Sequence, residues 1–202
     1  MELEMKFLRK YPVGNLSVNV QNFTASSDAN LCMIEQGTGP ERRIGLVAYV
    51  HRMEYRIVYQ FKSLLGASLT AIPLCQWWLV LDNSPQGTVP TTSDIFSGAS
   101  IGDTLPNPYY LDRFTILDAG ILEFPVAGQV HQANFKEGTI TMTDHLVADI
   151  NRRFHFTGAN GGIAECQSHA IYLYAAAPRD SNSAYGTPSI AANIQFFFTD
   201  EE

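Results

Sequence analysis

Residues 75–96 read CQWWLVLDNSPQGTVPTTSDIF, and the character of this stretch changes at a single point. Residues 77–81 form a run of large, β-favouring side chains, which ends abruptly at Asp-Asn-Ser-Pro. The run is too short for a stable helix and therefore predicts a strand that is buried on both faces. Beyond it, Thr92 or Ser93 is expected to cap a short helical turn at residues 94–96. The stretch indicates a rigid β-scaffold that opens into a long loop.

The composition predicts one domain with an unusually uncharged surface. The chain has 202 residues, which is long enough for a single substantial core. Apolar residues make up 46% of it and charged residues only 16%, below the usual quarter. So few charges indicate that partners cover much of the surface. The net charge of −7 argues against a free nucleic-acid-binding protein, because such proteins are usually basic.

The three cysteines, Cys32, Cys75 and Cys166, form no Cys-x-x-Cys pair. An odd number without zinc-site spacing predicts buried free thiols in a reducing compartment. No apolar run approaches the ~20 residues that span a bilayer, so no membrane partner is expected.

Alternation of apolar and polar residues, which is typical of half-buried strands, recurs along the chain. It is clearest at residues 15–21, 44–61 and 190–198. Residues 1–10 are instead expected to form a short helix, because their acidic residues precede their basic ones, as the helix dipole prefers.

Seven to nine strands with long, uneven loops and no repeats predict an all-β fold. We expect a single eight-stranded antiparallel jelly-roll sandwich with little helix. Residues 1–14 are expected to be an N-terminal segment and residues 15–202 the jelly-roll domain. Residues 15–61 and 75–199 would form the two four-stranded sheets.

No catalytic constellation is recognisable, so no enzymatic activity is expected. The sequence lacks a Gly-x-Ser-x-Gly motif, and its five histidines lie on separate predicted elements. They form no His-x-His or His-Glu-x-x-His pattern, so the ligands of a metal-dependent jelly-roll enzyme are missing. No cofactor is expected, apart from calcium at contacts between subunits through Asp200, Glu201 and Glu202. Solvated acids are the alternative interpretation of these carboxylates.

Basic residues cluster on the predicted strands. Those next to aromatic residues on a sheet surface can bind single-stranded nucleic acid through phosphate contacts and base stacking. The candidates are Arg42, Arg43, Arg52, Arg56, Arg152 and Arg153. The alternative is an ordinary strand with surface ion pairs, as the order Arg52-Glu54-Arg56 also permits.

Five segments then occur in a recognisable order. They are LVLDNSPQG at residues 79–87, LDRFTIL at 111–117, NRRFHF at 151–156, HAIYLYAAAP at 169–178 and NIQFFFTD at 193–200. Their order and spacing resemble the capsid proteins of small circular single-stranded DNA viruses, the geminivirus-like group. The coat protein of satellite tobacco necrosis virus is similar in its RFTIL segment and in a Thr-Asp near the C-terminus. The resemblance covers roughly residues 44–200.

The resemblance implies a structural capsid protein that self-assembles into a small icosahedral, T=1-type shell around circular single-stranded DNA. It places the protein in the virion, with assembly in the host nucleus and a host receptor or vector as a further partner. Such proteins normally begin with an Arg/Lys-rich arm, whereas residues 1–14 contain only Lys6, Arg9 and Lys10. The expectation is that the arm is absent or removed, and that DNA binding is correspondingly weak.

A second hypothesis is a jelly-roll module that binds carbohydrate or a receptor and forms a small oligomer. It predicts a ligand pocket among the loops at residues 62–74, 82–108 and 178–188. Particle formation would favour the capsid hypothesis, and glycan binding by a small oligomer would favour the module.

Overall fold

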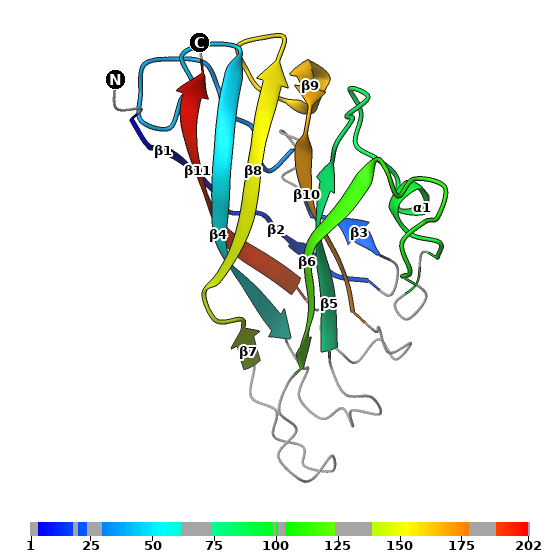
Figure 1. Cartoon of the computed structure of the whole chain (residues 1–202). Coiled ribbons are helices and arrows are strands. Elements are labelled where there is room, and N and C mark those ends of the chain that lie inside the picture. Colours follow the sequence, from blue (N-terminus) through cyan, green and yellow to red (C-terminus); the bar gives the residue numbers. More distant parts are fainter. Residues whose placement is uncertain are drawn as a thin grey trace, which may run out of the picture.

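The computed structural model shows two antiparallel β-sheets packed face to face (Figure 1). It describes residues 4–17, 20–23, 30–61, 74–98, 100, 104–123, 139–177 and 189–201. The predicted loops at residues 62–73 and 178–188 therefore lie outside the described residues. The strands are β1 (Lys6–Lys10), β2 (Val13–Asn15), β3 (Gln21–Asn22), β4 (Val47–Phe61), β5 (Leu74–Asp82), β6 (Phe114–Glu123), β7 (Thr139–Met142), β8 (Leu146–Phe156), β9 (Cys166–Ser168), β10 (Ala170–Ala176) and β11 (Ser189–Glu201). The helices are α1 (Thr92–Ile95) and a 3₁₀ turn at Ile163–Glu165.

One sheet has seven strands and the other has four. The seven-stranded sheet has the order β1-β11-β4-β8-β9, with β2 paired to β11 and β7 paired to β4. The four-stranded sheet has the order β3-β10-β5-β6. The chain passes between the sheets after β2, β3, β4, β6, β9 and β10, so each sheet interleaves early and late strands. This arrangement is consistent with a jelly roll.

The all-β antiparallel sandwich with little helix is confirmed. The described residues form eleven strands rather than eight. The expectation of two four-stranded sheets is wrong for one of them, because β1 and β2 pair with β11 and β7 pairs with β4, which gives that sheet seven strands. A jelly roll is closed by such pairings between distant segments, and alternation within one strand does not reveal them.

The expected helix at residues 1–10 is wrong, because Lys6–Lys10 forms the edge strand β1. β1 pairs with β11, and Leu8 lies opposite Phe196 with its side chain buried. A helix of ten residues is marginal in water, whereas β1 gains a ladder of backbone hydrogen bonds and a buried leucine. Lys6 is also buried and forms an ion pair with Asp200 at 2.6 Å.

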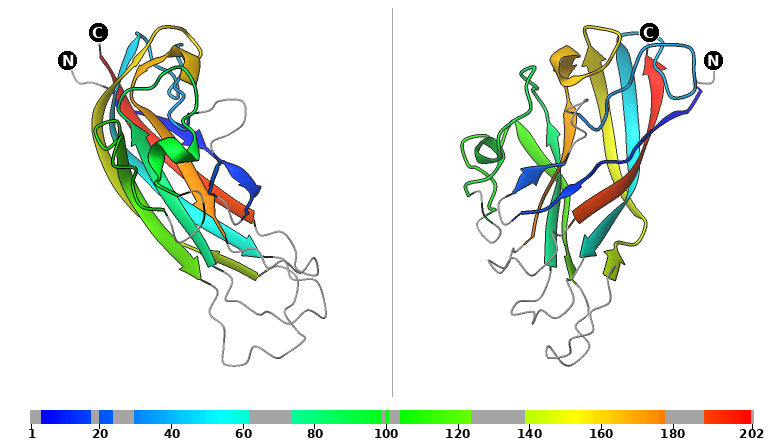
Figure 2. Two further views of the ribbon diagram at one scale, coloured as in Figure 1. Left: turned by 90° about the vertical axis from the view of Figure 1, so that its right-hand side faces the viewer. Right: turned by 180° about the vertical axis from the view of Figure 1, so that it is seen from behind.

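β5 is buried on both faces, as its sequence predicts. Trp77, Leu79 and Leu81 belong to the core between the two sheets. Trp78 and Val80 face the other way, into a second apolar cluster that the chain's own α1 region covers. The long loop after β5 therefore folds back over the four-stranded sheet (Figure 2).

The α1 region is held against β5 and β10 by aromatic packing. Phe96 lies 5.1 Å from Trp78 between ring centroids and 6.1 Å from Tyr174. The cap of α1 is Thr91, whose backbone N–H donates to Asp94 Oδ2 at 2.7 Å. The predicted cap at Thr92 or Ser93 is thus wrong by one or two positions.

Candidate functional site

Arg43 is fully buried and takes part in the fold itself. Its guanidinium donates to the carbonyl oxygens of Ile34, at 2.9 Å, Gly45 and Gly158. It also lies over the Phe156 ring, 4.4 Å from the centroid. In this fold Arg43 is therefore unavailable to nucleic acid, although the sequence made it a candidate. It connects residues 34–45 to the turn after β8 instead.

Arg42 and Arg153 are exposed, but each already faces a carboxylate. Arg42 lies 3.4 Å from Glu35, and Arg153 Nε lies 2.6 Å from Glu201. Arg152 is exposed and donates to the backbone carbonyl of Asn151 at 3.1 Å. Arg152 and Arg153 both lie on β8, which pairs with β4, whereas Arg42 precedes β4. Because Arg43 is buried, the six candidates do not form one surface.

Arg52 and Arg56 share the outer face of β4, where the sequence places them. Arg52 forms an ion pair with Glu54 at 2.9 Å and lies over the Phe197 ring at 4.7 Å. Arg56 reaches the Met142 sulfur at 4.0 Å, and no carboxylate of the described residues lies within ion-pair distance of it. The ion-pair interpretation thus fits Arg52, whereas Arg56 remains free for an anionic ligand.

The C-terminal carboxylates are engaged in contacts within the chain. Asp200 binds Lys6 and accepts the Ile44 backbone N–H at 2.9 Å, and Glu201 binds Arg153. Glu202 lies outside the described residues. Within the described ranges, no group of three or more His, Cys, Asp or Glu side chains is arranged to hold a metal.

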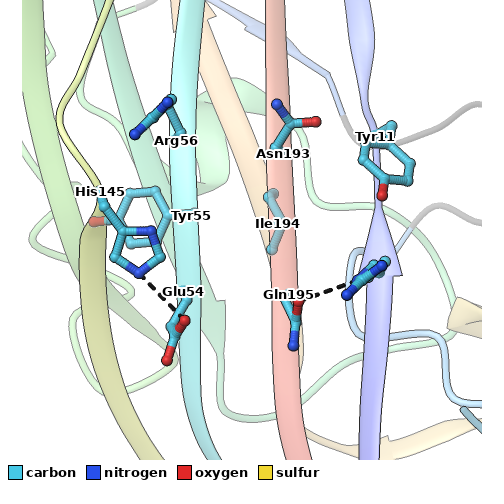
Figure 3. A pocket seen from close by; sticks show the side chains of 9 residues that line it. Tyr11, Glu54, Tyr55, Arg56, His145, Asn193, Ile194 and Gln195 are labelled. Atoms are coloured by element: carbon cyan, nitrogen blue, oxygen red, sulfur yellow. Dashed lines mark hydrogen bonds and ion pairs between the residues drawn. The ribbon is translucent and has the colours of Figure 1, made fainter.

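A hollow of about 370 Å³ lies on the outer face of the seven-stranded sheet (Figure 3). It is lined by side chains and backbone from four separate parts of the chain. The lining residues are Arg9, Tyr11, Glu54, Tyr55, Arg56, His145, Asn193, Ile194 and Gln195. Tyr55 and Ile194 are buried, and the other side chains lie around them on the outer face.

The strand register explains why these residues meet. Gln195 lies opposite Arg9 on one side and Glu54 on the other, and Arg9 Nε donates to its side-chain oxygen at 3.1 Å. Asn193 lies opposite Arg56. Sequence reasoning missed Arg9 because it placed residues 1–10 in a helix. The sequence pattern did indicate that Asn193 and Gln195 lie on the outer face of the sheet, because they occupy the polar positions of the alternating segment at residues 190–198.

A second feature is an exposed apolar loop at residues 105–111. Leu105, Tyr109, Tyr110 and Leu111 are exposed by 71%, 89%, 42% and 58%. Large side chains gathered in the open in this way mark interaction surfaces. Aromatic residues in particular are enriched at protein–protein interfaces.

The apolar loop is ordered by hydrogen bonds, not by burial. Asn107 donates its backbone N–H to the Ile95 carbonyl at 2.8 Å and its side-chain N–H to the Ser93 carbonyl at 2.7 Å. Its side-chain oxygen accepts the Tyr109 N–H at 3.1 Å. A loop fixed in advance loses less entropy when it binds a partner.

A buried ion pair anchors the end of the same loop. Arg113 donates Nε to Asp82 Oδ1 at 3.0 Å and a terminal nitrogen to Oδ2 at 2.8 Å. Asp82 is fully buried at the end of β5 and also accepts the Ser84 backbone N–H. The hydrogen bond to Asp82 raises the pKa of Arg113. The turn that ends β5 is thereby locked to the strand that follows the loop.

Another set of exposed apolar residues lies at the opposite edge of the sandwich. Met5, Ile44 and Leu46 are exposed by 55%, 63% and 51%. They flank β1 and the start of β4, whereas the apolar loop lies beside α1 across the molecule (Figure 1). We refer to these three residues as the terminal apolar set.

All three cysteines are buried and free, as their spacing predicts. Burial raises the pKa of Cys75 to about 12 and that of Cys166 to about 11, and it also raises the pKa of Cys32. At neutral pH these thiols are protonated, and a protonated thiol is a poor nucleophile.

Comparison with known proteins adds little to this description. No protein-family profile matches the chain, and no curated protein matches it. One solved structure with weak similarity is an unassembled pentamer of a mutant Washington University polyomavirus VP1. It has 15% sequence identity and a TM-score of 0.27, over 96% of this chain and 94% of that one. A TM-score this low supports no conclusion about function. No helix in the described ranges is long and apolar enough to cross a membrane.

Proposed function

We propose that this protein is a structural capsid protein whose copies assemble into a closed shell. The observation that carries the proposal is a jelly-roll-like sandwich with exposed apolar residues at two opposite edges. Two different surfaces at opposite edges favour head-to-tail contacts, and such contacts form closed rings when the rotation between copies permits. The low charge content also fits a subunit that buries its flanks.

The finer parts of the proposal come from the sequence resemblance. They are a small icosahedral, T=1-type shell, circular single-stranded DNA inside it, location in the virion and assembly in the host nucleus. A host receptor or vector belongs to the same set. Calcium at subunit contacts is a separate part of the proposal, which rests on the carboxylates Asp200, Glu201 and Glu202. The sheet order supports the fold on which the resemblance depends.

The experiment is to measure particle formation by negative-stain microscopy and by light scattering after size-exclusion chromatography. We expect uniform particles from the wild-type chain. The double variant Tyr109→Ser/Leu111→Ser should lose them, because aromatic residues at the centre of an interface typically contribute ~2 kcal/mol or more each. Its thermal stability should change little, since both side chains are exposed in the single chain.

Val147→Ser is the matched control, because Val147 is 54% exposed but lies on β8, outside both apolar regions. It should leave the particles intact. A wild-type chain that stays monomeric at high concentration in both low and high salt would refute the capsid proposal. A small oligomer that binds glycans would favour the carbohydrate- or receptor-binding module.

A further inference from the structure

We propose that the hollow on the outer face of the seven-stranded sheet binds one nucleotide unit of a single-stranded nucleic acid. Arg9 and Arg56 would contact phosphate, and Tyr11 would stack on a base. The inference rests on the proposed function, because it gives a capsid subunit a specific contact with its genome. It assigns Arg9 and Tyr11 a role that their sequence context does not reveal, and it adds Asn193 and Gln195 to the same site.

The charge of the hollow is the first argument. Glu54 is the one carboxylate among its nine lining residues. This carboxylate is already engaged, by Arg52 at 2.9 Å and by His145 at 3.2 Å. Arg9 and Arg56 have no carboxylate within ion-pair distance in the described part of the chain. The hollow is therefore locally cationic on a protein of net charge −7, and phosphate contacts require such a surface.

The second argument is the aromatic and amide chemistry around these cations. Tyr11 is 66% exposed at the end of β1, and a base can stack on such a ring without sequence preference. Asn193 and Gln195 present amide groups that can donate to and accept from base edges. Figure 3 shows Tyr11, which follows β1, beside Asn193 of β11 and Arg56 of β4. Cationic, stacking and hydrogen-bonding groups thus lie within one hollow.

The shape of the site selects a single strand. A single strand can turn its bases toward a sheet surface, whereas a duplex keeps its bases stacked inside and offers mainly its backbone. The neighbouring strands lie ~4.8 Å apart, and Arg9 lies two strands from β4 across β11. Arg9 is in register with Gln195 and Glu54, and Arg56 lies two residues further along β4, opposite Asn193. A sulfated glycan would use the two arginines but has no aromatic base to stack on Tyr11, and this difference separates the two ligands experimentally.

The test is fluorescence anisotropy of a labelled ten-nucleotide oligo(dT) with the full chain in its native assembly state. Arg56→Gln should weaken binding about 5-fold to 10-fold and make the salt dependence shallower by ~0.7 in log–log slope, the value for one lost contact to a single strand. Tyr11→Ser should weaken binding about 5-fold or more through lost stacking. The matched control is Arg42→Gln, since Arg42 is a 53% exposed arginine outside the hollow, and it should change binding less than 2-fold.

Two substitutions of opposite charge at Asn193 provide a second test, because both remove the same amide and they differ in the sign of the charge they introduce. Asn193→Lys should tighten oligo(dT) binding, and Asn193→Asp should weaken it. Equal losses from Arg56→Gln and Arg42→Gln, or no response to either change at Asn193, would overturn the proposal. So would a heparin octasaccharide that binds more tightly than oligo(dT) and is insensitive to Tyr11→Ser. Particle formation is measured in parallel and should be normal in every variant, so a failure of assembly is distinguishable from a failure of nucleotide binding.

Discussion

Replacing Asp82 by asparagine removes one charge from the buried ion pair that anchors the apolar loop. Asp82 is fully buried, and the Arg113 side chain is only 15% exposed. Removing one partner of a buried pair typically costs ~3–5 kcal/mol, because the remaining charge is left uncompensated. Asparagine can still accept one hydrogen bond, and Arg113 has some access to water. We therefore expect a loss near the lower end, about 3 kcal/mol.

The assay is urea unfolding at neutral pH together with thermal melting. For a chain of this length, a loss of about 3 kcal/mol corresponds to a fall in melting temperature of roughly 6–12 °C. The slope of free energy against urea should stay the same, because the surface exposed on unfolding is nearly unchanged. Asp82→Asn should also impair particle formation, because the apolar loop loses its anchor.

The control is Glu54→Gln, which breaks the surface pair with Arg52. The Arg52 side chain is 50% exposed, and pairs of this kind contribute only ~0–1 kcal/mol. If Asp82→Asn and Glu54→Gln destabilise the protein equally, the Asp82–Arg113 pair does not anchor the fold and the reasoning is refuted.

Three further predictions can be checked by unfolding measurements. Gly161→Ala should destabilise the protein by more than ~2 kcal/mol, because Gly161 has φ +70° and an added Cβ would lie 2.6 Å from the Ile34 carbonyl oxygen. Gly87 also has a positive φ, +76°, but lies in open space, so Gly87→Ala should cost only ~1 kcal/mol. Equal losses of stability from the two variants would contradict the argument. Burial raises the pKa of Cys166 and Cys75, so these thiols ionise at lower pH in the unfolded chain than in the folded protein. The stability that they contribute should be fully present below the ordinary thiol pKa near 9 and should fall as the pH rises toward 11–12. A urea midpoint that does not change between pH 8 and pH 11 would disprove this. Calcium at the C-terminal carboxylates predicts that a chelator lowers the melting temperature of the particles and that added calcium restores it, and an unchanged melting temperature would remove calcium from the proposal.

The sequence was most informative where one strand carries its own signal. The run at residues 77–81 is apolar at every position, and both faces of β5 are indeed buried. Alternation likewise located β4 and β11, because a half-buried strand repeats its environment every two residues. These patterns are local, so they can be interpreted without knowledge of the neighbouring strands.

Prediction failed where the outcome depended on a partner distant in the sequence. Residues 1–10 have a charge order that suits a helix, but pairing with β11 makes them a strand. Arg43 follows Arg42 in the sequence, yet one is fully buried against three carbonyls and the other is exposed. Nothing in the identity of two adjacent arginines distinguishes these environments.

The sequence by itself determined that the protein is an all-β chain with a fully buried aromatic strand, free buried thiols and a sparsely charged surface. Composition and period-two alternation can be read from the sequence without knowledge of the tertiary contacts, and they were sufficient for these conclusions. Only the tertiary structure decided that Trp78 packs beneath the chain's own α1 region and that Arg9, Tyr11, Arg56 and Asn193 line one hollow. These placements follow from pairing register and from the passage of the chain between two sheets, which join residues more than 180 positions apart.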